Sequence, residues 1–451
     1  MDARVIVIGG GLSGLTTAYA LNRAGVDVQV LESGERPGGC IKTSRKQGFL
    51  VEHGPNSMLV NRQQVLDLLQ ELDLNDQLQE ANDAANKRYI VKNGQMHPLP
   101  SSPLSFIRTP LFSAGDKLGL FREPFIKRGP RDESVADFVR RRLGKGFYEY
   151  AINPFVSGVY AGDPEQLLAR AAVKKVWALE ERHGSLIRGA IALMTGRDRP
   201  PGRIKGKMIS FKDGMQVLPS TLAEKLGDRV QTGVAVQKLV REDDGSWTVL
   251  ADGQRFSARH LVLATPANVT ADLLEPFNGD AAQALRSIPY APVTVAHFGF
   301  DRKALKHALD GFGCLIPRKE GITTLGTLFS STLFPGRLPE EDTALLTCFI
   351  GGSTFTQIRD WQENQVRETV LADLQKIIGI DAEPRFAHFV RWSRAIPQYT
   401  FGHDQRLDTV TATLNDLGNI SARANWRDGI SVPDCILNAL THGTELAQAE
   451  P

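Results

Sequence analysis

A glycine-rich turn close to the start of the chain limits the fold more than any other feature. The apolar, β-branched residues 5–8 predict a buried parallel strand, and Gly9, Gly11 and Gly14 follow it directly. Such glycines let a backbone turn tightly and approach a pyrophosphate, while a helix over residues 13–21 turns its positive N-terminus toward the phosphates. A second predicted strand, 26–31, leads to Glu32, a hydrogen-bond acceptor for a ribose hydroxyl. The predicted dinucleotide site comprises Gly9, Gly10, Gly11, Leu12, Ser13, Gly14 and Glu32.

A second glycine pair indicates which dinucleotide is bound. Arg36 precedes Gly38 and Gly39, and a strand-like stretch, 48–51, leads to a further turn at 54–57. Nicotinamide enzymes do not need these additional turns, whereas a flavin dinucleotide extends past the first loop and does. Arg36 would place a cation near the diphosphate. The sequence therefore predicts FAD as the cofactor.

The composition argues against two other classes of protein. With 42% hydrophobic and 23% charged residues, the chain resembles an ordinary globular protein, and its formal net charge of +2 is not that of a nucleic-acid binder. Neither the nine histidines nor the four cysteines have metal-ligand spacing, so we expect no metal ion. We expect the cysteines to be reduced thiols. They are Cys40, Cys314, Cys348 and Cys435.

The sequence contains no pattern for targeting or for crossing a membrane. The first predicted strand begins almost at Met1, and no run of about 18 apolar residues occurs, which predicts a cytoplasmic protein. Residues 98–129 interleave apolar and basic side chains. This pattern suits either a peripheral contact with the inner face of the cell membrane or the packing of a helical subdomain.

Strand patterns later in the chain predict interleaved domains. Strands at 230–240, 247–250 and 261–264 would complete the nucleotide-binding sheet, and strands at 292–300, 325–329 and 345–350 would form a second sheet. Residues 63–78 and 135–155 read as helical, and 197–206 as a loop. The predicted class is α/β: a discontinuous Rossmann-type FAD-binding domain (1–80, 205–265 and 385–451), a helical subdomain (81–204) and an α+β substrate domain (266–384).

Further motifs are specific enough to indicate a family. They are 54–57 (GPNS), 153–163 (NPFVSGVYAGD), Glu180 with 184–185 (GS), 311–317 (GFGCLIP), 333–337 (LFPGR), 396–399 (IPQY) with 402–403 (GH), and Gly429 with 434–435 (DC). With these motifs, nearly the whole chain resembles the oxygen-dependent, FAD-containing protoporphyrinogen oxidases of the flavin amine oxidase superfamily. The segments around Gly158 and Phe334 distinguish this family from amine oxidases and phytoene desaturases.

The resemblance implies an oxidase for a flat, apolar macrocycle edged with propionates. Hydrides would pass from the bridging carbons of protoporphyrinogen IX to the flavin, and oxygen would be reduced to hydrogen peroxide. Because the pyrroles stabilise the developing cation, the protein mainly has to orient the macrocycle and exclude water. Coproporphyrinogen III is the alternative substrate within the family. A flavin- or porphyrin-binding homologue without activity is the alternative of another class, and the resemblance leaves a homodimer open.

The resemblance also implies roles for individual residues. The catalytic candidates are Asn56, which would orient substrate or flavin, Arg88, which would pair with a propionate, and Gly158, beside the reacting edge; Lys87 is the neighbour that could replace Arg88. The residues expected to enclose the macrocycle are Phe312, Leu315, Leu328 and Phe349. The further cofactor contacts are Gly54, Pro55, Asn56, Ser57, Val236, Trp392, Ile430, Ser431 and Val432.

One loop departs from the family pattern. Ala424 stands where the family has glycine, Arg423 stands where an apolar residue is usual, and Ser431 stands where glycine is common. A missing glycine costs little where φ is negative. Where the position needs a positive φ or a close approach to the ligand, the extra side chain displaces the backbone and lowers flavin affinity or rate.

Overall fold

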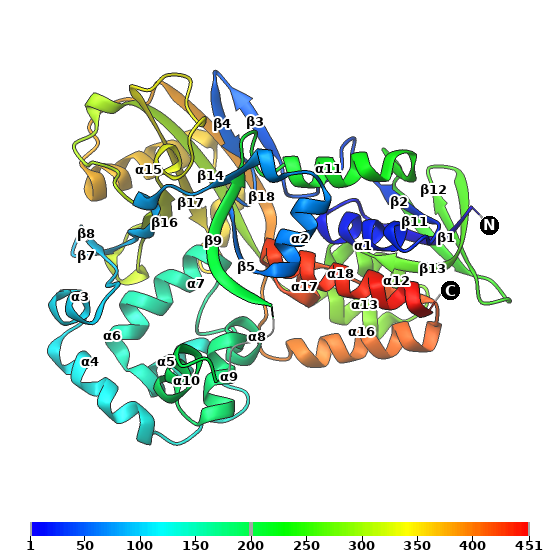
Figure 1. Ribbon diagram of the computed structural model, residues 1–451, viewed down its shortest axis with the longest axis horizontal. Helices are drawn as coiled ribbons and strands as arrows, with labels where there is room; N and C mark the ends of the chain where they lie inside the picture. Colours follow the sequence, from blue (N-terminus) through cyan, green and yellow to red (C-terminus); the bar gives the residue numbers. More distant parts are fainter. Residues whose placement is uncertain (1, 198–201, 450–451) are drawn as a thin grey trace.

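A computed structural model describes residues 2–197 and 202–449, and within these ranges it contains two seven-stranded sheets, two smaller sheets and many helices (Figure 1). The predicted α/β class is confirmed. The first sheet lies on the right of Figure 1, the second on the left, and a group of helices lies below the second. Among the described residues, no helix is both long and apolar enough to span a bilayer.

The first sheet has the order β10-β2-β1-β13-β12-β11, with β19 also paired to β13. Its strands are β1 (Ala3–Ile8), β2 (Val28–Glu32), β10 (Val230–Thr232), β11 (Val236–Arg241), β12 (Trp247–Ala251), β13 (Gln254–Leu263) and β19 (Ile420–Ala422). β1 runs parallel to β2 and β13, and β19 runs parallel to the second half of β13. The sheet therefore joins segments from the start, middle and end of the chain.

Helices cover both faces of this sheet, which explains why the apolar run 5–8 does not alternate with polar residues. Val5 and Val7 are buried in one apolar core, and Ile6 and Ile8 in the core on the other face. The first core is covered by α1 (Leu12–Arg23), α2 (Gln63–Glu71), α11 (Val217–Leu226) and α18 (Val432–Ala449). The second is covered by α12 (Ala267–Leu274), α13 (Gly279–Arg286), α16 (His403–Leu417) and α17 (Asn425–Asp428).

The second sheet has the order β18-β14-β17-β16-β15-β7-β8. Its strands are β7 (Tyr89–Lys92), β8 (Gln95–Pro98), β14 (Tyr290–Asp301), β15 (Gly313–Leu315), β16 (Thr324–Leu328), β17 (Thr343–Gly351) and β18 (Phe386–Pro397). Helix α15 (Glu363–Ile378) packs on one face, where Phe298, Cys348 and Ile350 form a buried core with it. Helix α14 (Ser330–Leu333) follows β16.

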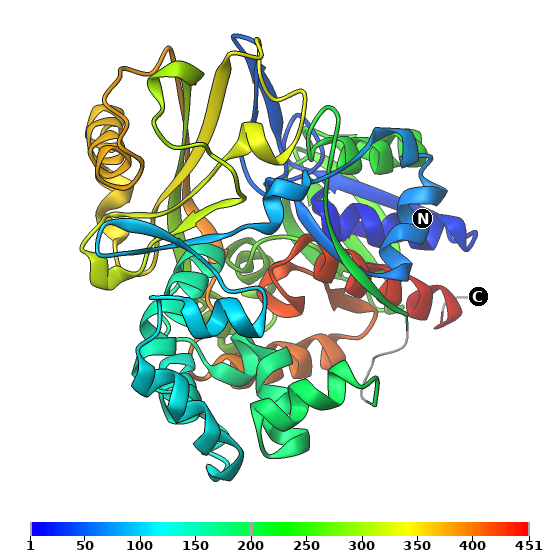
Figure 2. The same cartoon turned by 60° about the vertical axis from the view of Figure 1, so that its left-hand side comes forward.

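Small sheets join the two large ones. The hairpin of β3 (Thr43–Lys46) and β4 (Phe49–Glu52) forms one, and β5 (Met58–Arg62), β9 (Arg203–Phe211) and β6 (Leu78–Glu80) form the other. Long β9 is the bright green strand that crosses the front of the molecule in Figure 2. The lower helices are α3 (Pro103–Arg108), α4 (Ala114–Gly119), α5 (Val135–Leu143), α6 (Lys145–Phe147), α7 (Asn153–Tyr160), α8 (Ala169–Ala172), α9 (Lys174–His183) and α10 (Leu186–Met194).

A buried ion network holds the lower helices together. Arg142, at the end of α5, is fully buried and donates to Glu123 at 3.2 Å and to Glu180 of α9. Glu123 also accepts the N–H of Leu186 at 2.7 Å and so caps the first turn of α10. Because a buried carboxylate is costly unless it is paired and hydrogen-bonded, these contacts require one mutual arrangement of the helices.

Several segments differ from the sequence expectation. β18 lies within the range 385–451 expected for the FAD-binding domain, and β7 and β8 lie within the range expected for the helical subdomain, yet all three pair into the second sheet. The loop expected at 197–206 is partly strand, because β9 begins at Arg203 and pairs with β5; residues 198–201 lie outside the described residues. The helix expected over 63–78 ends at Glu71.

Candidate active site

The first glycine turn has the geometry that a dinucleotide requires. Gly9 has φ +109°, and a Cβ there would lie 2.8 Å from the carbonyl oxygen of Ala264. A Cβ on Gly14 would overlap the carbonyl oxygen of Gly9, so α1 can begin this close to β1 only with glycine. A Cβ on Gly11, by contrast, would meet no atom within 4 Å. This open side of the turn, at the N-terminus of α1, suits a pyrophosphate.

Glu32 ends β2 beside this turn. Its two carboxylate oxygens accept the backbone N–H of Gly10 at 2.6 Å and that of Gly34 at 2.7 Å. The carbonyl of Glu32 accepts the N–H of Val234 at 2.9 Å, which brings the start of β11 and the half-buried Val236 close to the same end of the sheet. Both of these predicted cofactor contacts therefore lie at the carboxyl end of β2, where a ribose and an adenine fit.

Three glycine turns stack on one another. Gly38 N–H donates to the carbonyl of Gly10 at 2.7 Å, and a Cβ on Gly39 would lie 3.4 Å from the Cα of Gly11. Gly54 in turn lies directly against the carbonyl of Cys40, too close for any side chain. The three turns form one continuous backbone surface, and this cradle fits a cofactor longer than a mononucleotide.

Arg36 is held within its own turn. Its guanidinium donates to the carbonyl oxygens of Pro37, Gly39 and Ile41 at 2.9–3.0 Å. Partial burial lowers the pKa of Arg36, opposed by the nearby Glu32 carboxylate. The side chain therefore fixes the shape of the second turn and keeps a positive charge in it.

The C-terminal helix places the remaining cofactor candidates. Ser431 caps α18, because its Oγ accepts the N–H of Asp434 at 3.2 Å and donates to the Asp434 carboxylate at 2.6 Å. Val432 is buried in the core that α18 shares with α1, and Ile430 packs beside Tyr399. Of the three, Ser431 is exposed.

The departing loop is less disturbed than the sequence suggested. Ala424 has φ −158°, an extended conformation that any residue adopts, and its side chain is buried in the core of the first sheet. Arg423 lies 3.6 Å from Asp428, and Arg427 lies 3.8 Å from the same carboxylate. The alanine therefore strains no backbone, and that reason for a weakened cofactor site does not hold.

Three of the four residues expected to enclose the macrocycle share one face of the second sheet, whereas Phe312 precedes β15 and packs in the same small cluster as Leu328. In register, Leu315 pairs with Gly326 and Gly326 with Phe349, while Leu328 pairs with Thr347 in the neighbouring row. Paired residues, and residues two apart, project to the same face. The side chains of Leu315, Leu328 and Phe349 are partly exposed there, in strands that are otherwise largely buried. The arrangement gives an apolar wall on the face opposite α15.

Arg88 and Gly158 lie at the edges of this wall. The Arg88 guanidinium lies 5.1 Å from the ring centre of Phe312, within cation–π distance. Gly158 of α7 contacts Leu315 so closely that a Cβ would overlap the leucine side chain. Lys87 instead forms an ion pair with Asp310 at 2.5 Å, to which Tyr89 also donates at 2.7 Å. Of the two candidate cations, Arg88 is therefore the one beside the wall.

Trp392 connects the wall to the glycine turns. It lies on β18 in register with Val293 and packs in the same apolar cluster as Phe349. Its indole Nε1–H donates to the carbonyl of His53, the residue before Gly54, at 2.7 Å. Asn56, two residues beyond Gly54, donates to the carbonyl of that glycine at 3.2 Å. The third glycine turn therefore belongs to the flavin cradle and is also connected to the second sheet through His53.

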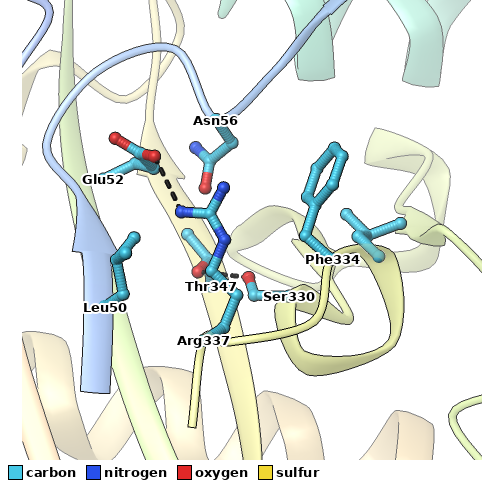
Figure 3. A pocket seen from close by; sticks show the side chains of 8 residues that line it. Leu50, Glu52, Asn56, Ser330, Phe334, Arg337 and Thr347 are labelled. Carbon is cyan, nitrogen blue, oxygen red and sulfur yellow. Dashed lines mark hydrogen bonds and ion pairs between the residues drawn. The ribbon is translucent and has the colours of Figure 1, made fainter. Parts of the chain in front are cut away.

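Sequence reasoning missed a buried ion pair next to Asn56. Glu52 of β4 and Arg337 are each 3% exposed and lie 2.8 Å apart, and Figure 3 shows the Asn56 side chain directed at the same guanidinium. Burial raises the pKa of Glu52, while Arg337 and Thr43 oppose that shift. In the sequence, the motif at 333–337 indicates only the family, and its arginine is the one signal of this ion pair.

The sequence profile of the family described as flavin containing amine oxidoreductase matches residues 12–427. The chain belongs to this family. It is 35% identical to the chloroplastic protoporphyrinogen oxidase of rice, over 99% of this chain and 88% of the relative, which places it with the protoporphyrinogen oxidases of the family. Protoporphyrinogen oxidase 2 of Arabidopsis thaliana is 33% identical over 95% of this chain and 91% of the relative. The coproporphyrinogen III oxidase of Bacillus subtilis is 27% identical over 96% of this chain and 95% of the relative.

Solved structures give the same result. A proposed protoporphyrinogen oxidase from Exiguobacterium sp. 255-15 superposes with a TM-score of 0.83 at 25% identity, over 100% of this chain and 99% of that one. A putrescine oxidase variant superposes with a TM-score of 0.73 at 20% identity, covering 99% and 98%, and shows the fold alone. The chain is a flavin-dependent oxidase with FAD as its cofactor, and the stacked glycine turns fit that cofactor.

Proposed function

We propose that the protein oxidises protoporphyrinogen IX to protoporphyrin IX in tetrapyrrole biosynthesis. The observation that carries the proposal is the apolar wall of Leu315, Leu328 and Phe349 with Arg88 at its edge. A flat apolar macrocycle with propionates on one side matches this combination, and the names of the relatives support it. Six electrons leave in three steps, each removing one hydride and one proton from the macrocycle.

The residues of the chain have positioning roles in this reaction. Bound FAD supplies a two-electron acceptor that dioxygen reoxidises with release of hydrogen peroxide. The wall residues and Phe312 would hold the macrocycle flat, Arg88 would pair with a propionate, and the α7 backbone at Gly158 would cover the reacting edge and exclude water. Asn56 would orient the ring system at the junction of cradle and wall.

Cofactor contacts follow the same reasoning. We propose that Gly9 to Gly14, Gly38 and Gly39 hold the pyrophosphate, that Glu32 holds the ribose, and that Val236 meets the adenine. The turn at 54–57, Trp392 and residues 430–432 would surround the flavin ring. Arg36 would act by shaping the second turn and by its charge.

Coproporphyrinogen III is the second candidate substrate, and the Bacillus subtilis relative supports it. It carries two more propionates than protoporphyrinogen IX, so it would need further cations. Lys87 is already neutralised by Asp310, which leaves Arg88 as the cation beside Phe312 and favours protoporphyrinogen IX.

Anaerobic mixing of the FAD-loaded protein with each porphyrinogen tests the proposal. We expect protoporphyrinogen IX to bleach the flavin band at about 450 nm, and air to restore it while porphyrin fluorescence appears. Faster bleaching by coproporphyrinogen III would reassign the substrate. A flavin that stays oxidised with both would favour a porphyrin-binding homologue without activity.

We further propose a peripheral contact with the inner face of the cell membrane. Ile107, Phe121 and Phe125 in the segment 103–126 are 67%, 76% and 81% exposed, and Arg108 and Arg122 lie among them in sequence. Exposed aromatic residues with basic neighbours suit an anionic bilayer surface. Sedimentation with anionic vesicles should carry down the native protein but not a Phe121→Asp/Phe125→Asp variant, and neither protein with neutral vesicles. Equal sedimentation of both proteins would refute this contact.

Two further predictions concern organisation. We propose that the substrate domain comprises 266–397 together with the hairpin 89–98, because their strands share a sheet. The FAD-binding domain would then comprise 1–80, 205–265 and 398–451, and the rest of 81–204 would form the helical subdomain. The homodimer stays a prediction, which sedimentation equilibrium tests.

A further inference from the structure

The two residues before the third glycine turn receive three donors from the substrate side of the molecule. Arg337, in the loop after α14, donates to the Glu52 carboxylate at 2.8 Å. His297 of β14 lies 3.1 Å from the Glu52 carbonyl, and Trp392 of β18 donates to the His53 carbonyl at 2.7 Å. Residues 52 and 53 are thus held at three points by segments that are distant in sequence.

The Glu52 carboxylate is also bound from the flavin side. It accepts the Thr43 hydroxyl at 2.6 Å and the Met215 N–H at 2.9 Å, just before α11. Arg337 makes a second bond, from Nη2 to the Ser210 hydroxyl of β9, at 2.6 Å. One buried ion pair therefore joins β3, β4, β9 and the start of α11 to the loop that follows Phe334.

His297 has one defined tautomer in this arrangement. A carbonyl only accepts, so Nε2 carries the proton that is donated to Glu52, and Nδ1 accepts from the Thr347 hydroxyl at 3.0 Å. Thr347 can then accept from Ser330, 2.7 Å away. Burial lowers the pKa of His297 to about 3, which keeps it neutral.

Two of the donors, His297 and Trp392, share a face with the substrate wall. His297 is in register with Thr347 and Thr347 with Leu328, while Trp392 is in register with Val293, four residues before His297. A cavity of about 10 Å³, large enough for one water molecule, lies among Asn56, Glu52, Arg337, Ser330 and Phe334 (Figure 3). Strands β14 and β18 are therefore hydrogen-bonded to the two residues directly before the third glycine turn.

We propose that Arg337 is a positioning residue: through its ion pair with Glu52 it fixes the segment 52–57, and with it Asn56, relative to the flavin and the substrate wall. Nothing in this role requires Arg337 to touch substrate. The measurement of the flavin reduction rate rests on the proposed function, whereas the circular dichroism and midpoint potential of the flavin do not.

The test compares two equally buried ion pairs. Arg337→Met, Arg337→Lys and the double variant Glu52→Gln/Arg337→Met are prepared with FAD bound, beside Glu123→Gln/Arg142→Met as the control. Arg142 and Glu123 are fully buried in the helical subdomain and belong to neither the cradle nor the wall. Each protein is assayed for melting temperature, FAD content, the visible circular dichroism and midpoint potential of the flavin, and the limiting rate of anaerobic flavin reduction.

We expect Arg337→Met and the double variant to keep FAD but to change the flavin dichroism, and to lower the limiting reduction rate by about tenfold to a hundredfold with unchanged substrate affinity. Arg337→Lys, which keeps the charge, should recover most of that rate. The control pair should lower the melting temperature alone.

If the Arg337 variants also change only the melting temperature, the positioning role is refuted. Should Arg337→Met not fold, Glu52→Gln against Glu123→Gln decides by the same readouts, because each isosteric amide weakens one of the two ion pairs. If no porphyrinogen reduces even the native protein, the proposed function fails, while the flavin dichroism and potential, which need no substrate, still decide this inference.

Discussion

Trp392 donates its indole N–H to the carbonyl oxygen of His53 across 2.7 Å, and so connects the edge strand of the second sheet to the backbone of the third glycine turn. The two residues are 339 positions apart in the chain. Because Trp392 also packs with Phe349, the same side chain contacts the substrate wall and the cofactor cradle. A direct hydrogen bond therefore connects the two large parts of the molecule at this point.

Trp392→Phe should weaken this connection. Phenylalanine keeps the apolar packing but leaves the His53 carbonyl without its donor, a loss of about 1–3 kcal/mol of stability. We expect a lower free energy of unfolding in urea and slower flavin reduction at saturating substrate. Trp361→Phe is the control, since Trp361 packs against the core on the opposite face. Equal effects of both variants on stability and on the rate of flavin reduction would contradict a connecting role for the Trp392–His53 hydrogen bond.

Gly14→Ala should abolish FAD binding. The new methyl group would overlap the carbonyl oxygen of Gly9, so the first turn must open and its N–H groups move away from the phosphates. The protein should purify colourless, with FAD content measured from its absorbance. Gly119→Ala, at a site in α4 where a Cβ meets nothing within 4 Å, should stay fully loaded. Retained flavin in Gly14→Ala would mean that the cofactor does not rest on this turn.

Arg88→Ala should raise the KM for protoporphyrinogen IX more than it lowers kcat. A charge-assisted bond to a propionate at a partly solvated site is worth about 1.5 kcal/mol, roughly tenfold in affinity. Lys87→Ala should have a smaller effect, because Lys87 already pairs with Asp310. Steady-state kinetics of the two variants decide between these residues, and a larger effect at Lys87 would exchange their roles.

Stability should fall in acid through His297. Burial lowers the pKa of this histidine from 6.5 to about 3, so between those values the unfolded chain binds one proton more than the folded one. The contribution is present above pH 6.5 and is lost as the pH falls, by about 1.4 kcal/mol per pH unit inside the window. His297→Gln cannot take up this proton. Urea unfolding at several pH values should give the variant a shallower slope, and an unchanged slope would contradict the assignment.

Local features of the sequence were sufficient for the first half of the nucleotide site. Strand β1, helix α1, strand β2 and Glu32 follow one another in a continuous segment, and glycine spacing and apolar runs define each of them. The wall could be anticipated only through family resemblance, because Leu315, Leu328 and Phe349 look like ordinary core residues of a sheet until their register is known.

Strand partners could not be derived in the same way. Nothing in the local sequence shows that β18 pairs with β14 in the second sheet, or that β7 and β8 belong to that sheet. The Glu52–Arg337 pair joins residues 285 positions apart, and neither neighbouring sequence shows that its charged side chain is buried. The strand at 203–206 was missed because this segment is mostly exposed and contains a glycine and two basic residues, a composition that is also typical of a loop.

The contact between α1 and α18 has a consequence for synthesis of the protein. Figure 1 shows α18 beside α1, and a Cβ on Gly443 of α18 would lie 2.7 Å from the Cβ of Ala20. Strand β19 also comes late in the chain and pairs with β13. On the ribosome, the nascent chain must therefore wait with an unfinished N-terminal sheet until its final helices emerge. FAD capture is accordingly expected only after α18 has emerged, and chaperones would meet an exposed apolar surface until then.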